Sequence, residues 1–476
     1  MKSVALHNLG CKVNSYEMDV MRQKLQENGY SIVPFDNRAD IYIVNTCTVT
    51  AIADKKSRQM LHQARKRNPE AIVVAAGCYV ETGKADLERD LEVDLLIGNK
   101  EKPEIVSVLA EYYSAHPEKK ADGSSTTAGS TETSGQPGVD CANADRTQGE
   151  SQLSGDEVST TDLEHAGSGE SHTRAFMKIQ DGCNQFCTYC IIPYARGRIT
   201  SRDDEDVLEE MKQYVKAGYH EFVLTGIHVS SFGMDRKGLS NVPDGESFDG
   251  SALLELFRKA DALPGVERLR FGSLEPRIIT EEFAQGLAAL KSFCPHFHLS
   301  LQSGCDATLK RMNRHYTTAQ FRESVEILRR VFDNPAITTD VITGFPGETE
   351  EEFAQTVEFV KDINFYEMHV FPYSRREGTP AAAMKEQLTN AQKKQRSDVL
   401  LEMTAQQAAA YRRAWIGKEV DVLLEEEQMI DGVRYQTGLT REYIRCAVRT
   451  DEDLQGQIVR GIVGDALSED IMTLCR

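Results

Sequence analysis

Hydrophobic residues in the first 113 positions occur in short runs that are separated by amphipathic segments. The apolar runs cover residues 3–9, 41–49, 71–78 and 94–99. Apolar positions with helical spacing lie between them, at about 14–28, 51–67 and 101–113. Alternation of buried strands with helices is typical of a mostly parallel sheet that carries helices on both faces. We therefore expect an open α/β sheet domain over residues 1–113.

The same alternation repeats six times over residues 173–375. Candidate strands lie at 174–181, 221–230, 268–274, 296–303, 336–345 and 365–374. Helical patterns follow at about 203–217, 251–262, 280–291, 305–331 and 349–361. Six such units predict an incomplete (β/α)6 barrel. In barrels of this kind, chemistry gathers at the C-terminal ends of the strands.

A third pattern follows a helical stretch at about 387–414. Val420, Val422 and Leu424 alternate with polar residues, as in a half-buried strand, and further short strands with turn residues between them follow. This pattern predicts a small C-terminal β-barrel, and thus an α/β protein with an all-β module. A chain of 476 residues is long enough for about three domains. We place the second and third domains at 173–395 and 412–476.

The segment 114–172 interrupts this organisation. It contains 11 acidic and 3 basic residues, no Phe, Tyr or Trp, and only four Val, Leu or Ile residues. Such a composition buries too little apolar surface to offset the entropy lost on ordering. We interpret the segment as an acidic, disordered linker.

Composition narrows the class of protein. Hydrophobic residues make up 40% of the chain, yet no run of 18 apolar residues predicts a membrane span. The N-terminus lacks a signal pattern, so the eleven cysteines indicate metal ligands in a reducing cytoplasm rather than disulfides. A net charge of −19 argues against non-specific attraction to nucleic acid, although a local basic face can still act at short range.

Three cysteines with the spacing C-x3-C-x2-C occur on one short segment, at Cys183, Cys187 and Cys190. Soft thiolates select iron–sulfur clusters, zinc or copper(I). Three thiolates on a four-iron cluster leave one iron without a protein ligand, and that iron can bind and activate a small molecule. The alternative is a zinc knuckle with an unseen fourth ligand. The uneven spacing and the lack of a nearby histidine favour the cluster.

Cys11, Cys47 and Cys78 each end one of the apolar runs of the first domain. Ligands of open parallel sheets bind beyond the carboxyl ends of the strands. The three thiols are therefore candidates for a second cluster ligand set, and the alternative is three small buried residues.

These segments resemble a known family. The run GCNQFCTYCIIPYARGR at 182–198 is similar to the cluster motif of radical S-adenosylmethionine (SAM) enzymes. Together with LGCKVNSYE at 9–17, VNTCTVT at 44–50 and AAGCY at 75–79, it resembles the methylthiotransferases. The C-terminal module resembles their RNA-binding TRAM barrel. The resemblance covers nearly the whole chain except 114–172.

The resemblance implies two [4Fe–4S] clusters and SAM as cofactors. Cys183, Cys187 and Cys190 match the ligands of the radical-generating cluster, whose open iron chelates SAM before a deoxyadenosyl radical is released. Cys11, Cys47 and Cys78 match those of the auxiliary cluster, which holds the sulfur to be inserted, while a second SAM supplies the methyl group. An aromatic C–H bond is too inert for acid–base chemistry, so a cofactor must carry this step.

Polar residues near the ends of the barrel strands are candidates for contact with SAM, and they are similar to family positions that line the cofactor. Thr225 and Gly226 end the second strand, although the family's usual G-G-E form is absent there and a plain tight turn is the alternative. Glu275, Gln302 and Asp340 lie near the ends of later strands, where each is equally consistent with a solvated loop residue.

Six basic residues and one acid fall between Ala53 and Pro69, within a predicted helix. Basic side chains on a helix suit RNA phosphates, and a solvated helix face is the alternative. The candidates for RNA binding are Lys55, Lys56, Arg58, Arg65, Lys66 and Arg67. The C-terminal module is acidic overall, so RNA binding there would depend on local patches such as Arg434, Arg441 and Arg445.

The family has three substrate branches, which modify isopentenyladenosine in tRNA, threonylcarbamoyladenosine in tRNA, or an aspartate of a ribosomal protein. The segments 7–17, 45–58 and 224–233 most resemble the threonylcarbamoyladenosine branch. In the implied reaction, position 2 of that adenosine, next to the anticodon, gains a methylthio group. The implied partners are a tRNA anticodon stem-loop and an electron donor such as flavodoxin or ferredoxin, with no DNA and no membrane. We expect a cytoplasmic monomer; a non-catalytic iron–sulfur or zinc RNA-binding protein is the alternative of another class.

Overall fold

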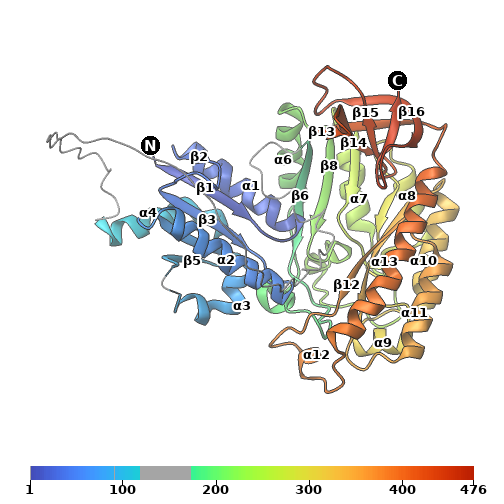
Figure 1. Cartoon of the computed structure of the whole chain (residues 1–476), viewed down its shortest axis with the longest axis horizontal. Coiled ribbons are helices and arrows are strands. Elements are labelled where there is room, and N and C mark those ends of the chain that lie inside the picture. Colours follow the sequence, from blue (N-terminus) through green and yellow to red (C-terminus); the bar gives the residue numbers. More distant parts are fainter. Residues whose placement is uncertain (1, 91, 118–172) are drawn as a thin grey trace, which may run out of the picture.

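The computed structural model describes residues 2–90, 92–117 and 173–476. The acidic linker expected at 114–172 therefore lies almost entirely outside the described residues, although Ser114 and Ala115 form the end of a helix. Figure 1 shows the N-terminal sheet beside the central barrel, with the C-terminal strands packed at one end of that barrel.

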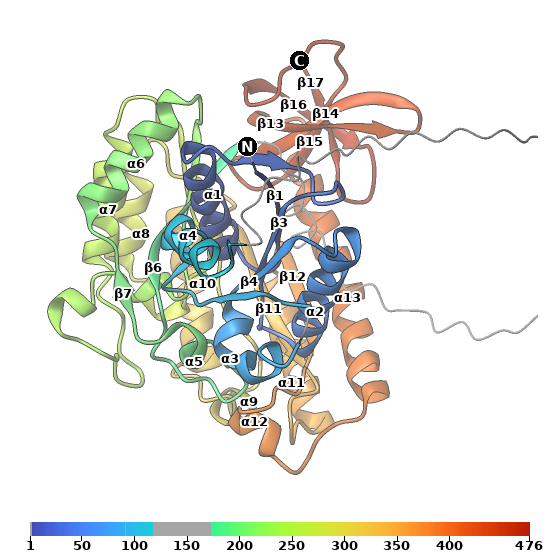
Figure 2. The same ribbon diagram turned by 90° about the vertical axis from the view of Figure 1, so that its left-hand side faces the viewer.

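The N-terminal domain is a five-stranded parallel sheet with helices on both faces (Figures 1 and 2). The strand order is β2-β1-β3-β4-β5. The strands are β1 Ser3–Asn8, β2 Ser31–Val33, β3 Ile41–Thr46, β4 Ile72–Gly77 and β5 Leu95–Ile97. The helices are α1 Lys12–Glu27, α2 Ala51–Arg67, α3 Cys78–Leu87 and α4 Ile105–Ala115.

Two apolar clusters, one on each face, hold this sheet between its helices. Met21 of α1 and Leu109 of α4 pack on one face, while Leu61 of α2 and Val80 of α3 pack on the other. This arrangement confirms the predicted α/β fold class. Strand β2 and helix α3 were not predicted, because β2 has only three residues and α3 begins at Cys78 directly after a strand.

Six parallel strands form the central incomplete barrel, as predicted. They are β6 Arg174–Asp181, β8 Glu221–Gly226, β9 Arg268–Phe271, β10 His296–His298, β11 Ala336–Thr343 and β12 Glu367–Pro372, with the short β7 Thr200–Ser201 antiparallel to β6. Single bridges such as Leu274–Leu299 join the β6–β9 sheet to the β10–β12 sheet. Large buried side chains such as Phe257, Phe271 and Phe297 fill the layer between strands and helices.

Most helices of the barrel lie close to their predicted positions, but the short α5 and α12 were not predicted and one predicted helix is divided. They are α5 Ile192–Arg196, α6 Asp204–Lys216, α7 Ser251–Asp261, α8 Glu281–Ala288, α9 Asp306–Arg311, α10 Thr318–Val331, α11 Glu350–Ile363 and α12 Pro380–Ala383. The single helix expected at 305–331 is wrong, because α9 ends near Asn313, which has a positive φ of 57°. Thr317 then starts α10 through a capping box with Gln320.

The C-terminal strands form a closed five-stranded barrel, which confirms the predicted β module. Helix α13 Asn390–Arg413 leads into β13 Glu419–Ile430, β14 Val433–Thr440, β15 Arg445–Val448, β16 Ile458–Ala466 and β17 Met472–Cys475. Arg268 and Arg270 of β9 donate hydrogen bonds of 2.6–2.8 Å to carbonyls of β13, of β14 and of Arg441 just beyond β14. Because Arg268 is the first residue of β9, the small barrel docks at the N-terminal ends of the central strands.

No helix in the described ranges is both long and apolar enough to cross a membrane.

Candidate active site

All six candidate cluster ligands line one cavity between the N-terminal domain and the central barrel. The cavity has a volume of about 280 Å³, and both polar and apolar residues of the two domains complete its wall. The cysteines that line it are Cys11, Cys47, Cys78, Cys183, Cys187 and Cys190. The two three-cysteine sets therefore face a shared space.

The N-terminal set comes from the carboxyl ends of three neighbouring strands. Cys11 follows β1, Cys47 follows β3 directly, and Cys78 is the first residue of α3 after β4. Gly10 has a positive φ of 110°, and a Cβ added there would lie 3.0 Å from the Cys47 sulfur. A side chain at Gly10 would thus crowd the Cys47 thiol and the Asn14 amide.

The second set lies on the loop after β6, at the mouth of the barrel. Asn313 holds this loop, because its side-chain amide donates to the carbonyls of Gln185 and Phe186 at 3.2 and 3.1 Å. The Thr188 hydroxyl donates to the Arg311 carbonyl at 2.8 Å. The turn after α9 therefore positions the cluster loop.

The electrostatics of these thiols fit metal ligands. Burial raises the pKa of Cys47 and the pKa of Cys183 to about 12. A buried thiolate needs a compensating positive charge, which a cluster supplies by direct bonding. Three soft donors in each set match the open four-iron cluster inferred from the spacing.

In each cysteine set, one sulfur accepts a hydrogen bond from an arginine. Arg314 Nη1 lies 3.2 Å from the Cys187 Sγ, and Arg196 Nε lies 3.2 Å from the Cys78 Sγ. Hydrogen bonds to ligand sulfurs stabilise negative charge and tune the potentials of clusters. Arg196 follows Cys190 by six residues, so it links the cluster loop to the ligand of the other set.

A buried ionic network fixes Arg196. Its guanidinium donates to both Glu17 carboxylate oxygens at 2.9 and 3.1 Å and to the Asn14 side-chain oxygen at 2.7 Å. Glu17 also pairs with Lys102 at 2.5 Å and with Lys178 at 2.7 Å. Burial alone would raise the pKa of Glu17, but these three cations hold it well below its usual range.

This network was not predicted from the sequence. Glu17 lies in an amphipathic helix, where a glutamate reads as a solvated residue, and Lys102 is 85 positions away along the chain. The Glu17–Lys102 pair forms within the N-terminal domain, and Arg196 and Lys178 join it from the central barrel.

Only two of the five candidate residues for SAM contact line the cavity. Gly226 and Glu275 line the cavity, whereas Thr225, Gln302 and Asp340 do not. The carboxylate of Glu275 accepts from Arg277 at 2.6 and 3.0 Å. Burial opposes ionisation, but Arg277 and the nearby His228 lower the pKa of Glu275 to about 2. Glu275 is therefore a buried anion at the barrel mouth.

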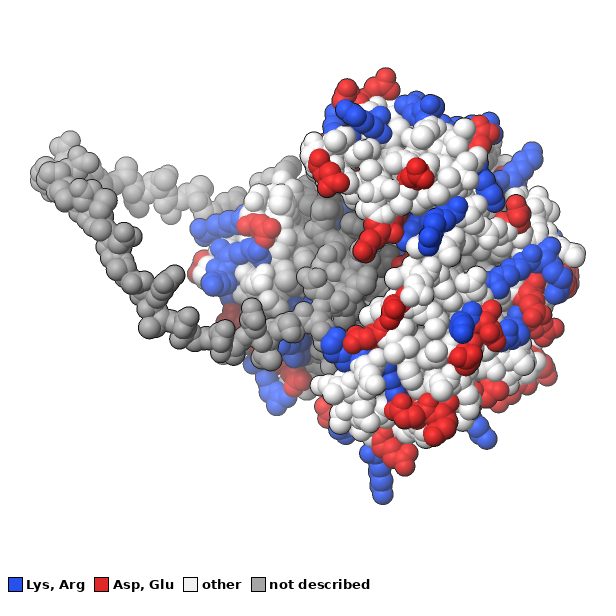
Figure 3. Space-filling model, turned by 45° about the vertical axis from the view of Figure 1, so that its right-hand side comes forward, with Lys and Arg blue, Asp and Glu red and all other residues white. Residues whose placement is uncertain are grey.

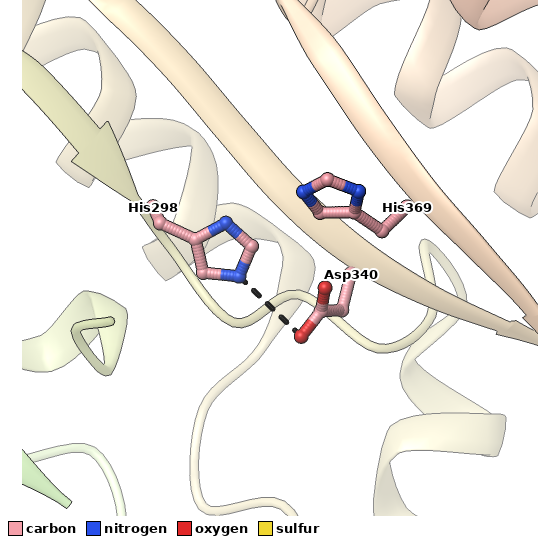
Figure 4. A group of neighbouring side chains, drawn as sticks. All are labelled: His298, Asp340 and His369. Atoms are coloured by element: carbon pink, nitrogen blue, oxygen red, sulfur yellow. Dashed lines mark ion pairs between the residues drawn. The ribbon is translucent and has the colours of Figure 1, made fainter. Parts of the chain in front are cut away.

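The carboxylate of Asp340 lies instead beside two histidines (Figure 4). Its Oδ2 is 3.4 Å from His298 Nε2, and His369 completes a group whose polar atoms are all within 4.8 Å of one another. The sequence analysis identified Asp340 as a candidate site residue but neither of the two histidines.

The six basic residues of α2 divide into two groups. Arg65 pairs with Asp94 at 2.5 Å, Arg67 pairs with Asp36, and Arg58 donates to the Tyr79 hydroxyl at 2.5 Å. These arginines tie the helix to its own domain. The side chains that remain exposed are Lys55, Lys56 and Lys66.

The arginines on which RNA binding at the C-terminal barrel would depend all have intramolecular partners. Arg434 pairs with Glu427 and Arg445 with Glu426, each at 2.7 Å. Arg441 donates to the Lys291 and Phe293 carbonyls at 2.7 Å. On the face drawn in Figure 3, basic and acidic side chains are interspersed.

Comparison with known proteins gives two family matches. Residues 177–360 match the model of the Radical SAM superfamily, and residues 3–98 match the Uncharacterized protein family UPF0004. The "Threonylcarbamoyladenosine tRNA methylthiotransferase MtaB" of Bacillus subtilis is 36% identical over 461 residues, which cover 97% of this chain and 93% of that protein.

Two further relatives extend the comparison. The "tRNA-2-methylthio-N(6)-dimethylallyladenosine synthase" of Carboxydothermus hydrogenoformans is 30% identical over 465 residues, covering 96% of both chains. The radical SAM methyltransferase TsrM of Kitasatospora setae shares the fold, with a TM-score of 0.52, 19% identity and coverage of 80% and 74%.

Enzymes of this superfamily use SAM and a [4Fe–4S] cluster, and methylthiotransferases use two clusters. The two three-cysteine sets around one cavity fit that requirement. On its sequence identity over nearly the whole length, this chain belongs to the methylthiotransferase family of radical SAM enzymes.

Proposed function

We propose that this enzyme adds a methylthio group to position 2 of N6-threonylcarbamoyladenosine, next to the anticodon of tRNA. The observation that carries the proposal is the cavity shared by two three-cysteine sets, because sulfur insertion requires a radical source and a sulfur donor at one substrate. When bound, the clusters and SAM supply the electron, the carbon-centred radical and the sulfur for this chemistry.

We infer the roles of the chain's own residues from their positions. Cys183, Cys187 and Cys190 would hold the cluster that binds SAM, and Cys11, Cys47 and Cys78 would hold the auxiliary cluster. Gly226 lines the cavity and packs directly against Gln180, because a Cβ there would lie 2.8 Å from Gln180 Oε1. Glu275, which lines the cavity, would accept a hydrogen bond from the ammonium group of SAM. Arg196 and Arg314 would stabilise the ligand sulfurs.

The choice of threonylcarbamoyladenosine rests on the relatives. Four relatives named for this nucleoside are 34–36% identical to the chain, and four named for dimethylallyladenosine are 30–33% identical. The target base lies in a single-stranded loop, so it can turn out of its stack into the cavity. Lys55, Lys56 and Lys66, which are exposed on α2, would contact phosphates of the same stem-loop. The reaction also requires an electron donor, for which a flavodoxin or ferredoxin is suited.

A deletion strain tests the substrate. Total tRNA from cells without this gene is digested to nucleosides and analysed by mass spectrometry. We expect the methylthio form of threonylcarbamoyladenosine to disappear, unmodified threonylcarbamoyladenosine to accumulate, and re-expression to restore the product. Persistence of the product in cells that carry no second such gene, or loss of methylthio-isopentenyladenosine instead, would contradict the proposal.

A further inference from the structure

Three ionisable side chains on adjacent strands converge inside the barrel (Figure 4). His298 comes from β10, Asp340 from β11 and His369 from β12, and their polar atoms all lie within 4.8 Å of one another. The strand register pairs Asp340 directly with His369. These residues therefore form one compact group of a carboxylate and two imidazoles.

The group faces the interior of the barrel rather than the helices. Side chains alternate along a strand, and the neighbours Leu299, Val341 and Val370 all pack into the apolar core under the helices. The side chain of His298 keeps 14% of its surface exposed, and that of Asp340 keeps 32%. The group is thus reachable by a ligand that enters the barrel mouth.

The chain just beyond β10 links the group to the cavity of the cysteines, although none of the three side chains lines that cavity. Ser300, two residues beyond His298 along the chain, lines that cavity. Lys12 follows Cys11, which lines the cavity from the other domain, and the positive charge of Lys12 acts on Asp340. Although burial alone would raise it, His298, His369 and Lys12 hold the pKa of Asp340 below its usual range. We call His298, Asp340, His369 and Lys12 the polar subsite.

The chemistry of the polar subsite discriminates between the substituents of the two tRNA nucleosides. A threonylcarbamoyl group carries a carboxylate, a hydroxyl and N–H donors, whereas an isopentenyl group is entirely apolar. Lys12 and the histidines suit the carboxylate, and Asp340 suits the hydroxyl or an N–H. An isopentenyl group would leave these side chains desolvated without partners, and sites built for hydrogen bonding reject such analogues strongly.

We propose that the polar subsite binds the threonylcarbamoyl group of the target adenosine and so selects this nucleoside. Lys12 and His369 face its carboxylate, and Asp340 accepts from its hydroxyl or carbamoyl N–H. His298 orients Asp340, since Thr338 Oγ1 lies 3.0 Å from its Nδ1 and leaves Nε2 directed at the carboxylate. This inference rests on the proposed function and adds the residues that determine its specificity.

A metal ion is the competing occupant, because two histidines and one carboxylate form a common ligand set. The positive charge of Lys12 acts on Asp340 together with the two histidines, which works against a cation at this place and suits an anionic ligand. The substrate assignment therefore accounts for all four residues, whereas a metal accounts for three.

The test compares anaerobically reconstituted wild-type enzyme with His369→Phe and Asp340→Asn. Each enzyme is given anticodon stem-loops that differ only in the target base: threonylcarbamoyladenosine, isopentenyladenosine or plain adenosine. Binding affinity is measured alongside turnover and SAM cleavage without RNA. His220→Gln is the matched control, because His220 pairs with Glu267 at the surface.

We expect both variants to bind the threonylcarbamoyl stem-loop about tenfold or more weakly than wild type, with unchanged affinity for the adenosine stem-loop and unchanged SAM cleavage. The control should match wild type throughout. Equal affinity of variants and wild type for the threonylcarbamoyl stem-loop would overturn the subsite assignment but not the proposed function. Equal losses on all stem-loops, or one zinc or manganese ion per chain that the variants lose, would also overturn it.

The same experiment distinguishes a failure of the subsite assignment from a failure of the proposed function. A wild-type enzyme that modifies the isopentenyl stem-loop and ignores the threonylcarbamoyl one contradicts the proposed function, and the subsite assignment falls with it. A wild-type enzyme that prefers the threonylcarbamoyl stem-loop supports the function whatever the variants do.

Discussion

The Arg196 side chain donates from Nε to the Cys78 sulfur at 3.2 Å, although the two residues belong to different domains. The same guanidinium binds Glu17 through both carboxylate oxygens. Only 1% of the Arg196 side chain is exposed. Arg196 thus holds the N-terminal sheet against the cluster loop that begins at Cys183.

Replacing Arg196 by glutamine should weaken both the domain contact and the auxiliary cluster. Removing one partner of a buried charge network costs about 3 kcal/mol or more. We expect a lower urea midpoint and loss of iron from the N-terminal cluster, seen as reduced iron and sulfide per chain. Arg202→Gln is the control, because Arg202 also joins the domains, through the Tyr16 hydroxyl at 3.0 Å, without a contact to sulfur. Equal iron loss in both variants would argue against a specific role for the Arg196–Cys78 bond.

The two cysteine sets should have separable activities. Cys187→Ala is expected to abolish cleavage of SAM to 5′-deoxyadenosine, because the radical-generating cluster loses a ligand. Cys47→Ala should retain part of that cleavage but insert no sulfur into RNA. Both products are quantified by chromatography of the same reaction. Identical losses of both activities in the two variants would refute the division of labour.

The exposed lysines of α2 should contribute to RNA affinity through phosphates. Replacing Lys55, Lys56 and Lys66 by glutamine is expected to reduce the slope of log K against log salt by about 2, since each contact to a single strand releases roughly 0.7 counterion. Arg65→Gln provides the comparison, because it breaks the ion pair with Asp94 and should lower stability rather than the salt slope. An unchanged slope in the triple variant would place the RNA elsewhere.

His7 should make the N-terminal domain sensitive to acid. Burial, followed by the charge of Arg67, lowers the pKa of His7 from 6.5 to about 4. Between these values the unfolded chain binds a proton that the folded chain does not, so stability is complete above pH 6.5 and falls as the pH decreases toward 4. The loss is up to about 3 kcal/mol.

The His7→Gln variant tests whether His7 causes this acid sensitivity. Urea unfolding of wild type and variant is compared at pH 7.5 and at pH 5. We expect the stability difference between the two pH values to be smaller in His7→Gln. The same pH dependence in both proteins would assign the acid sensitivity to other groups.

The elements of the fold follow from local patterns, whereas the site depends on contacts between distant segments. Apolar runs and helical spacing predicted α2 at its observed bounds and all six strands of the central barrel. The sequence spacing of Cys183, Cys187 and Cys190 was by itself enough to indicate a cluster. The Glu17–Lys102 pair and the His298–Asp340 pair join different elements, so no local pattern encodes them.

Metal analysis of the anaerobically purified protein tests the central claim that two clusters share one cavity. The account predicts about eight irons and eight sulfides per chain, since each cubic cluster has four of each. It also predicts about four irons in Cys47→Ala and about four in Cys187→Ala, with the remaining cluster intact by electron paramagnetic resonance. Zinc without acid-labile sulfide, or about four irons in the wild-type protein, would contradict the account.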